Sequence, residues 1–116
     1  MKFLMTYTGE PHAVDPGPEY HAKIQQFATD MVKSGKVLMT GGMIRPTKGT
    51  KLAYYKNEFS VTDGPFAETK ELIDGFALVS VASKEEAIEL ARQFMSLAGE
   101  GRGEILQLFD EDFPKE

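Results

Sequence analysis

Ionisable side chains gather in one short stretch of the chain and could carry out acid–base chemistry. Asp63 is followed closely by Glu68 and Lys70. If Asp63 and Glu68 shared a poorly solvated site, one carboxyl group would keep its proton and could pass it to a substrate. The alternative is structural, because an Asp before Gly-Pro caps its own turn and clustered charges form a solvated loop surface. The sequence leaves both interpretations open.

Other candidate site residues lie earlier in the chain. His21 sits at the edge of an apolar helix stripe, where it is either a third acid–base group or a half-exposed packing residue. Gly41 and Gly42 lack side chains and would allow a ligand to approach the backbone closely. Arg45 could hold an anionic ligand or form an ion pair. We therefore take Gly41, Gly42, Arg45 and Lys70 as candidate ligand-binding residues.

Helices and strands must position these candidate residues. Hydrophobic periodicity predicts eight such secondary-structure elements. Their order is strand, helix, strand, two strands of a hairpin, strand, helix and strand. A loop over residues 56–58 is predicted to join the hairpin. The strands are expected at residues 2–8, 37–40, 52–55, 59–62, 75–81 and 104–109, and the first helix at 18–34.

The second helix has recognisable start and stop signals. Ser83 and Glu86 form a capping box, in which the Ser hydroxyl accepts from a backbone N–H at the helix start. Gly99, Gly101 and Gly103 are predicted to end this helix, because glycine is favoured just past a helix C-terminus.

This element order predicts an α+β fold of the ferredoxin-like βαββαβ type with an extra hairpin. Two helices would cover one face of a mainly antiparallel sheet and leave the other face bare. Residues 75–81 are apolar on both sides of their strand. An uncovered sheet would therefore expose an apolar patch, and we expect a homodimer to cover it.

Composition narrows the class of protein. The 116 residues suit a single domain, residues 1–116, and we expect the acidic tail at residues 110–116 to be loosely held. A net charge of -5 argues against nucleic acid as a partner. No apolar run approaches the ~20 residues of a membrane span. The chain has no cysteine and only two histidines, without metal-ligand spacing, so we expect no metal, no cofactor and a cytoplasmic location.

The longest specific motif is the run VTDGPFAETKELIDGF at residues 61–76. It resembles the signature of the DGPF subgroup of the YCII-related family. The similarity extends to the first strand and to residues 35–38, 83–87 and 104–109, so it covers nearly the whole chain. The resemblance implies a dimeric α/β barrel built from two ferredoxin-like sheets.

The same resemblance implies much less about chemistry. Members of the family are largely unassigned, and some lie beside sigma-factor genes or are fused to them. A related branch of lyases removes chloride from chlorinated hydroquinones with a His–Asp pair. The His of that pair lies early in the first helix, where this chain has His21.

Two functions remain open at this point. The first is a metabolite-sensing or regulatory module that binds a small molecule beside the DGPF loop, with a sigma factor or another regulator as a partner. The alternative is a cofactor-independent lyase or isomerase in which Asp63, Glu68 and His21 are the catalytic acid–base groups.

Overall fold

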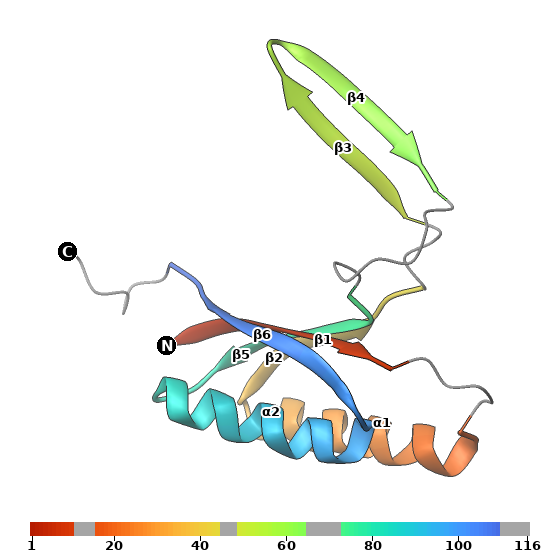
Figure 1. The fold of residues 1–116 in the computed structure, drawn as a ribbon. Helices are drawn as coiled ribbons and strands as arrows, with labels where there is room; N and C mark the ends of the chain where they lie inside the picture. The colour runs from red at the N-terminus through yellow and green to blue at the C-terminus, as the bar shows by residue number, and fades with distance from the viewer. Residues whose placement is uncertain (11–15, 45–48, 65–72, 110–116) are drawn as a thin grey trace.

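Two helices lie against one face of a four-stranded sheet, and a separate two-stranded hairpin stands apart from it (Figure 1). The computed structural model describes residues 1–10, 16–44, 49–64 and 73–109. The elements are β1 (Lys2–Gly9), α1 (Pro18–Lys33), β2 (Val37–Gly42), β3 (Thr50–Tyr55), β4 (Glu58–Asp63), β5 (Gly75–Ser80), α2 (Lys84–Ala98) and β6 (Gly101–Gln107).

The sheet has the order β2-β5-β1-β6, and every neighbouring pair is antiparallel. Each helix connects two strands that are not neighbours, α1 between β1 and β2 and α2 between β5 and β6. Both connections place their helix on the same face of the sheet (Figure 1). The predicted α+β class and ferredoxin-like arrangement are confirmed. Neither α1 nor α2, the helices of the described chain, combines the length and apolar character needed to cross a membrane.

Most predicted element ends agree with the structure, and α2 begins as expected. The Ser83 hydroxyl accepts a hydrogen bond from the Glu86 N–H at 3.2 Å, which confirms the N-cap. Gly99 follows the helix with φ +106°, a conformation that favours glycine. Within the described residues no side chain caps the start of α1, which instead places Pro18 in its first turn.

Two local predictions were wrong. The hairpin turn contains two residues rather than three, because Lys56 and Asn57 both have positive φ, at 52° and 65°. Such a turn matches the twist of the flanking strands. Gly101 and Gly103 do not end α2 but lie inside β6. A side chain at either position would collide with a backbone oxygen of β1, so these glycines allow the two strands to approach closely.

The buried core lies at one end of the interface between helices and sheet. Phe3 on β1 and Val79 on β5 are register partners and are only 2% and 0% exposed. Ala87 and Leu90 of α2 pack with them. No residue of α1, which the structure describes throughout, is buried. The first helix therefore packs more loosely than the second.

Within the described residues no helix covers the face of the sheet opposite α1 and α2, as predicted, and a row of apolar side chains crosses that face. Alternation and register place four side chains in one row across the four strands. We call this row the open sheet face; its members are Met39, Leu78, Leu4 and Leu106. Met39 and Leu106 are 58% and 51% exposed.

Candidate ligand pocket

A cavity of about 440 Å³ lies between the helices and the sheet. The cavity forms because the side chains that face the helices become smaller along the strands. On β5 the helix-facing residues shrink from Val79 through Ala77 to Gly75, and on β2 they shrink from Val37 to Gly42. Because protein interiors are otherwise close-packed, small residues on facing surfaces leave space between the layers. The taper therefore closes one end of the interface and opens the other.

The helices supply apolar walls for this cavity. The Phe27 and Phe94 rings, from α1 and α2, have their centroids 6.3 Å apart. Phe94 also meets the Tyr7 ring edge-on at 5.3 Å. The other apolar side chains that the helices contribute are long or small, namely Ile24, Ala28 and Met31 on α1 and Leu90, Ala91, Met95 and Ala98 on α2. Such a surface suits an apolar or aromatic ligand.

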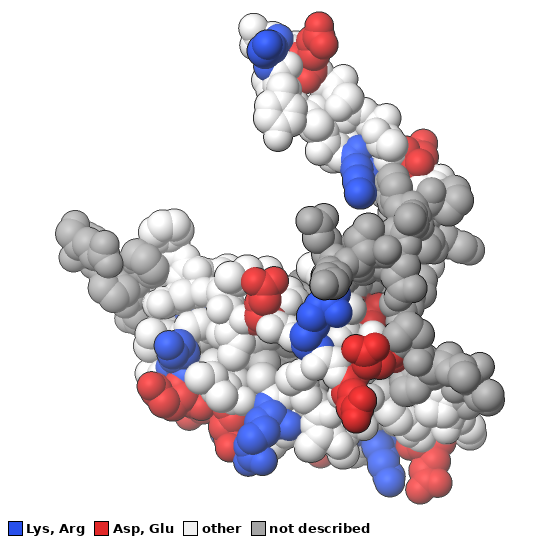
Figure 2. Space-filling view, in the orientation of Figure 1, with Lys and Arg blue, Asp and Glu red and all other residues white. Residues whose placement is uncertain are grey.

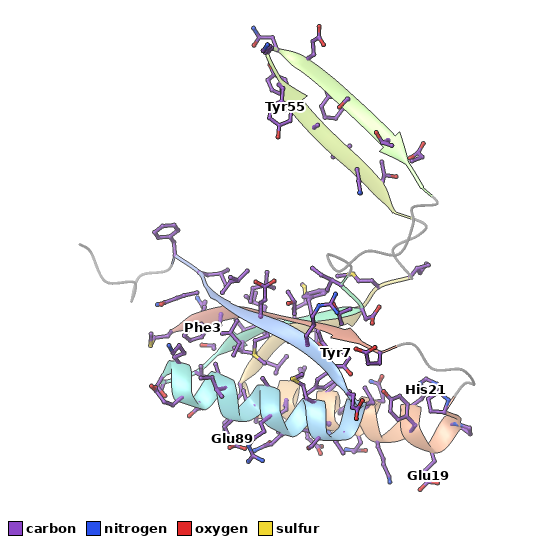
Figure 3. All side chains as sticks on the ribbon, viewed as in Figure 1. Phe3, Tyr7, Glu19, His21, Tyr55 and Glu89 are labelled. Carbon is purple, nitrogen blue, oxygen red and sulfur yellow. The ribbon has the colours of Figure 1, made fainter. Side chains whose placement is uncertain are left out.

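Polar side chains gather at the end of the pocket away from Phe3 (Figure 3). The Tyr7 hydroxyl donates to the Gly99 carbonyl oxygen at 2.9 Å, and the Tyr20 hydroxyl donates to the Ala98 carbonyl oxygen at 2.6 Å. The last carbonyls of a helix have no partner within the helix itself. The two tyrosines therefore satisfy the C-terminus of α2 and fix their own rings beside the cavity.

Asp74 is a half-buried residue whose carboxylate also lines the pocket. Hydrogen bonds of its side chain and of its backbone fix its position. Its Oδ2 accepts from the Gly9 N–H at 2.8 Å, and its N–H donates to the Tyr7 carbonyl oxygen at 2.8 Å. Its carbonyl oxygen accepts from the Met43 N–H at 2.7 Å. These bonds hold the carboxylate at the point where β1, β2 and β5 come together.

The environment at this end keeps the Tyr7 phenol neutral. Burial is the main reason that its pKa is raised above its ordinary value, and Tyr20, Asp74 and Glu10 raise it further. A phenol that does not ionise remains a hydrogen-bond donor while its oxygen can still accept.

Three of the predicted site residues lie at the pocket. His21, Gly41 and Gly42 all line it, and the His21 ring meets the Tyr20 ring edge-on at 5.3 Å. His21 is exposed on its outer side. The structure therefore brings an imidazole, two phenols and a carboxylate to one cavity.

The other predicted site residues are placed elsewhere or lie outside the described residues. Asp63 is exposed at the end of β4, where its Oδ1 accepts from the Thr50 hydroxyl at 2.8 Å. It does not belong to the described lining of the pocket. Arg45, Glu68 and Lys70 fall outside the described residues, so their roles stay predictions.

Sequence reasoning missed Asp74, Tyr7 and Tyr20. Asp74 could have been recognised in the sequence, since it stands directly before Gly75 at the start of a predicted strand and lies near the end of the long motif. The sequence pattern placed Tyr7 and Tyr20 only among the apolar residues of a strand and of a helix. Among residues 1–10, 16–44, 49–64 and 73–109, no three His, Cys, Asp or Glu side chains gather as a metal site would require.

The fold and the pocket together define an α+β protein of the ferredoxin-like type with a cavity between its layers. The chain belongs to the YCII-related family, whose domain matches residues 1–110, and this confirms the resemblance seen in the motif. An uncharacterised protein of Rhizobium meliloti (strain 1021) is 41% identical over 61 residues, which are 53% of this chain and 49% of the relative. The chain thus spans about half the length of this curated relative.

Proposed function

We propose that the protein binds a small, mainly apolar molecule with one polar group, and that it acts as a metabolite-sensing module. The observation that carries this proposal is the tapered interface, which leaves about 440 Å³ between helices and sheet with its polar groups at one end. Pockets of roughly 300–1,000 Å³ with apolar walls and few polar groups are typical of small-molecule sites.

The chemistry of the lining indicates which ligand would fit. Phe27 and Phe94 favour a ring or chain in the apolar part. At the other end the Asp74 carboxylate attracts a hydrogen-bond donor and repels an anion. The pocket therefore favours a neutral hydroxyl compound over a carboxylate of the same shape.

The test compares p-cresol with benzoate as probes, followed by chemical-shift changes in ¹⁵N spectra of the full chain. We expect p-cresol to shift amides of residues at the pocket, such as Gly75, and benzoate to bind at least about tenfold more weakly. Ala28→Leu fills the cavity from α1 and should abolish the p-cresol shifts. Ala22→Leu adds the same side chain at an exposed position of α1 and serves as the matched control. Binding that Ala28→Leu leaves unchanged would exclude this pocket as the site.

A second candidate function is metal-free acid–base catalysis of the lyase or isomerase type. Its support is that His21 and Asp74 line one cavity. A positioned base contributes roughly 10²–10⁴-fold to a rate. Once a substrate is found, Asp74→Asn and His21→Gln should each remove most turnover while the folded state is kept. Full activity in both variants would leave binding as the function.

A further inference from the structure

The polar end of the pocket presents mainly hydrogen-bond acceptors. Tyr7 and Tyr20 donate their single hydroxyl protons to carbonyl oxygens at the C-terminus of α2. Thr40, which also lines the pocket, donates its hydroxyl proton to the Phe76 carbonyl oxygen at 2.8 Å. A hydroxyl oxygen whose proton is engaged can still accept through its lone pairs. These three hydroxyl groups therefore offer a ligand acceptors in place of donors.

The same end of the pocket is electrostatically negative. Asp74 places a carboxylate in the lining, and the C-terminus of α2 adds the negative end of the helix dipole. The last turn of α2, a helix that the structure describes throughout, contains no basic residue to offset this dipole. Burial is the main cause of the raised pKa of Tyr7, and Tyr20 is the second. Asp74 and Glu10 raise this pKa further, so their negative charges act at the Tyr7 hydroxyl.

The pocket lining, within the described part of the chain, contains neither Lys nor Arg. Lys23 is exposed on α1, and its Nζ lies 3.7 Å from Oε1 of Glu19. Arg102 pairs with Thr8, and alternation places both on the face of the sheet opposite Tyr7. The coloured Lys and Arg side chains in Figure 2 are scattered singly over the surface in view. The described lining therefore attracts a cation and repels an anion.

Aromatic rings border the same end of the pocket. The Tyr7 and Phe94 rings meet edge-on with their centroids 5.3 Å apart. The Tyr20 ring lies beside His21, which is labelled with Tyr7 at this end in Figure 3. The face of an aromatic ring carries partial negative charge and attracts a cation within about 6 Å. A cationic group beside Asp74 therefore gains a second attraction from these rings.

We propose that the ligand of this pocket is a primary amine, with its ammonium group at Asp74 and its apolar part between Phe27 and Phe94. This inference rests on the proposed function and names the charge of the ligand's polar group. An ammonium group has three hydrogen-bond donors and no acceptor, which matches a carboxylate and two phenol oxygens. A hydroxyl group has one donor and turns its own lone pairs toward acceptors. The pocket therefore favours an amine over an alcohol, and an alcohol over a carboxylate.

The cost of removing the ammonium group from water is limited at this position. Burying a charge is costly unless the charge is paired and hydrogen-bonded. Asp74 is half-buried and His21 is exposed, so this end of the pocket is open in part to solvent. An ammonium group there pairs with the carboxylate and keeps part of its hydration. The attraction therefore exceeds the cost of desolvation.

The first experiment compares benzylamine with benzyl alcohol, which share one ring and one methylene group and differ in the polar group. An alkyl ammonium group stays protonated at neutral pH, as that of lysine does. Titrations of the full chain, followed by ¹⁵N chemical shifts of amides such as Gly75, give both dissociation constants. We expect the constant for benzylamine to be at least about tenfold lower. Equal or weaker binding of benzylamine would overturn the proposal.

The second experiment removes the carboxylate. Asp74→Asn keeps an oxygen that can accept from the Gly9 N–H, so the fold should be retained. It should weaken benzylamine binding at least about tenfold and leave benzyl alcohol within about twofold. Asp30→Asn is the matched control, because Asp30 is exposed on α1, accepts from the Gln26 amide and lies outside the pocket lining. Equal losses of benzylamine affinity in the two variants would assign the preference to net charge and overturn the proposal.

Failure of the amine preference and failure of the proposed function give different results. If p-cresol, benzyl alcohol and benzylamine all leave the pocket amides unshifted, both proposals are overturned. If the two neutral probes bind and benzylamine binds no more tightly, the pocket remains a small-molecule site and only the amine preference is overturned.

Discussion

The two ends of the helix–sheet interface differ although they share the same strands. At one end Phe3 lies opposite Val79, and both are buried. At the other end Tyr7 lies opposite Gly75, beside a cavity. The register of β1 with β5 continues unchanged between the two pairs, so on these two strands the ends differ in side-chain size.

The two ends also hold α2 in different ways. Its N-terminus, near the closed end, is capped by the Ser83 hydroxyl. Its C-terminus, at the open end, is held by the hydroxyls of Tyr7 and Tyr20. The buried core adds to the cap at the first end, whereas hydroxyl groups from β1 and α1 supply the hydrogen bonds at the second. The protein thereby keeps its cavity, while the carbonyl groups at the C-terminus of α2 still have hydrogen-bond donors.

The largest loss of stability should come from removing a buried side chain at the closed end of the helix–sheet interface. Phe3→Ala removes a buried ring and should lower the free energy of unfolding by about 3–5 kcal/mol. Leu4→Ala, at the next position and on the open sheet face, should cost clearly less because Leu4 is only half-buried. Urea denaturation measures both values. Equal losses would show that the closed end is not the main core.

A smaller loss should follow from Gly103→Ala at the open end, where Gly103 pairs with Tyr7. The added methyl group would collide with the backbone oxygen of Thr6 and push the strands apart, at a cost of about 1–3 kcal/mol. In Gly42→Ala the new Cβ would lie 3.7 Å from the Asp74 carbonyl oxygen, an ordinary contact. Thermal unfolding should therefore separate the two variants, and similar melting temperatures would contradict the close approach.

The caps of α2 provide the next comparison. Ser83→Ala removes the N-cap and should lower the free energy of unfolding by roughly 0.5–2 kcal/mol. Ser96→Ala is the control, because Ser96 is an exposed residue near the other end of α2 whose hydroxyl donates to the Gln93 carbonyl oxygen within its own helical turn. A Ser83→Ala protein as stable as the wild type would show that the cap adds nothing.

The smallest effect is expected in alkaline solution, where Tyr7 titrates. Its pKa is raised in the folded state, chiefly by burial, above the ordinary 10.0. Its contribution is complete below pH 10.0 and is lost as the pH rises through the folded pKa, because the unfolded phenol ionises first. Wild type should therefore lose more stability than Tyr7→Phe on going from pH 9 to pH 11. Parallel stability curves for the two proteins would contradict this assignment.

Sequence patterns predicted the order of elements, the Ser83 cap and the bare sheet face, because each depends on local periodicity or local hydrogen bonding. The pocket could not be predicted in the same way. Val79, Ala77 and Gly75 form a taper only once pairing places them against β1 and below the helices. Asp63 shows the same limit. Its turn motif could be recognised in the sequence, whereas its position at the end of β4 in the hairpin could not be predicted.

The two ends of the hairpin are joined by a hydrogen bond from the Gly64 N–H to the Gly49 carbonyl oxygen at 2.9 Å, and this bond affects how fast the chain folds. Pairing β2 with β5 must close the long segment between Met43 and Asp74, and the entropic cost of closure grows with loop length. The hairpin inside this segment has a two-residue turn and can form locally within roughly 1–10 μs. Once its ends meet, the length of chain that must still be closed is about halved, which lowers the closure cost by about 0.6 kcal/mol. Early closure of β3 on β4 therefore speeds the pairing of β2 with β5.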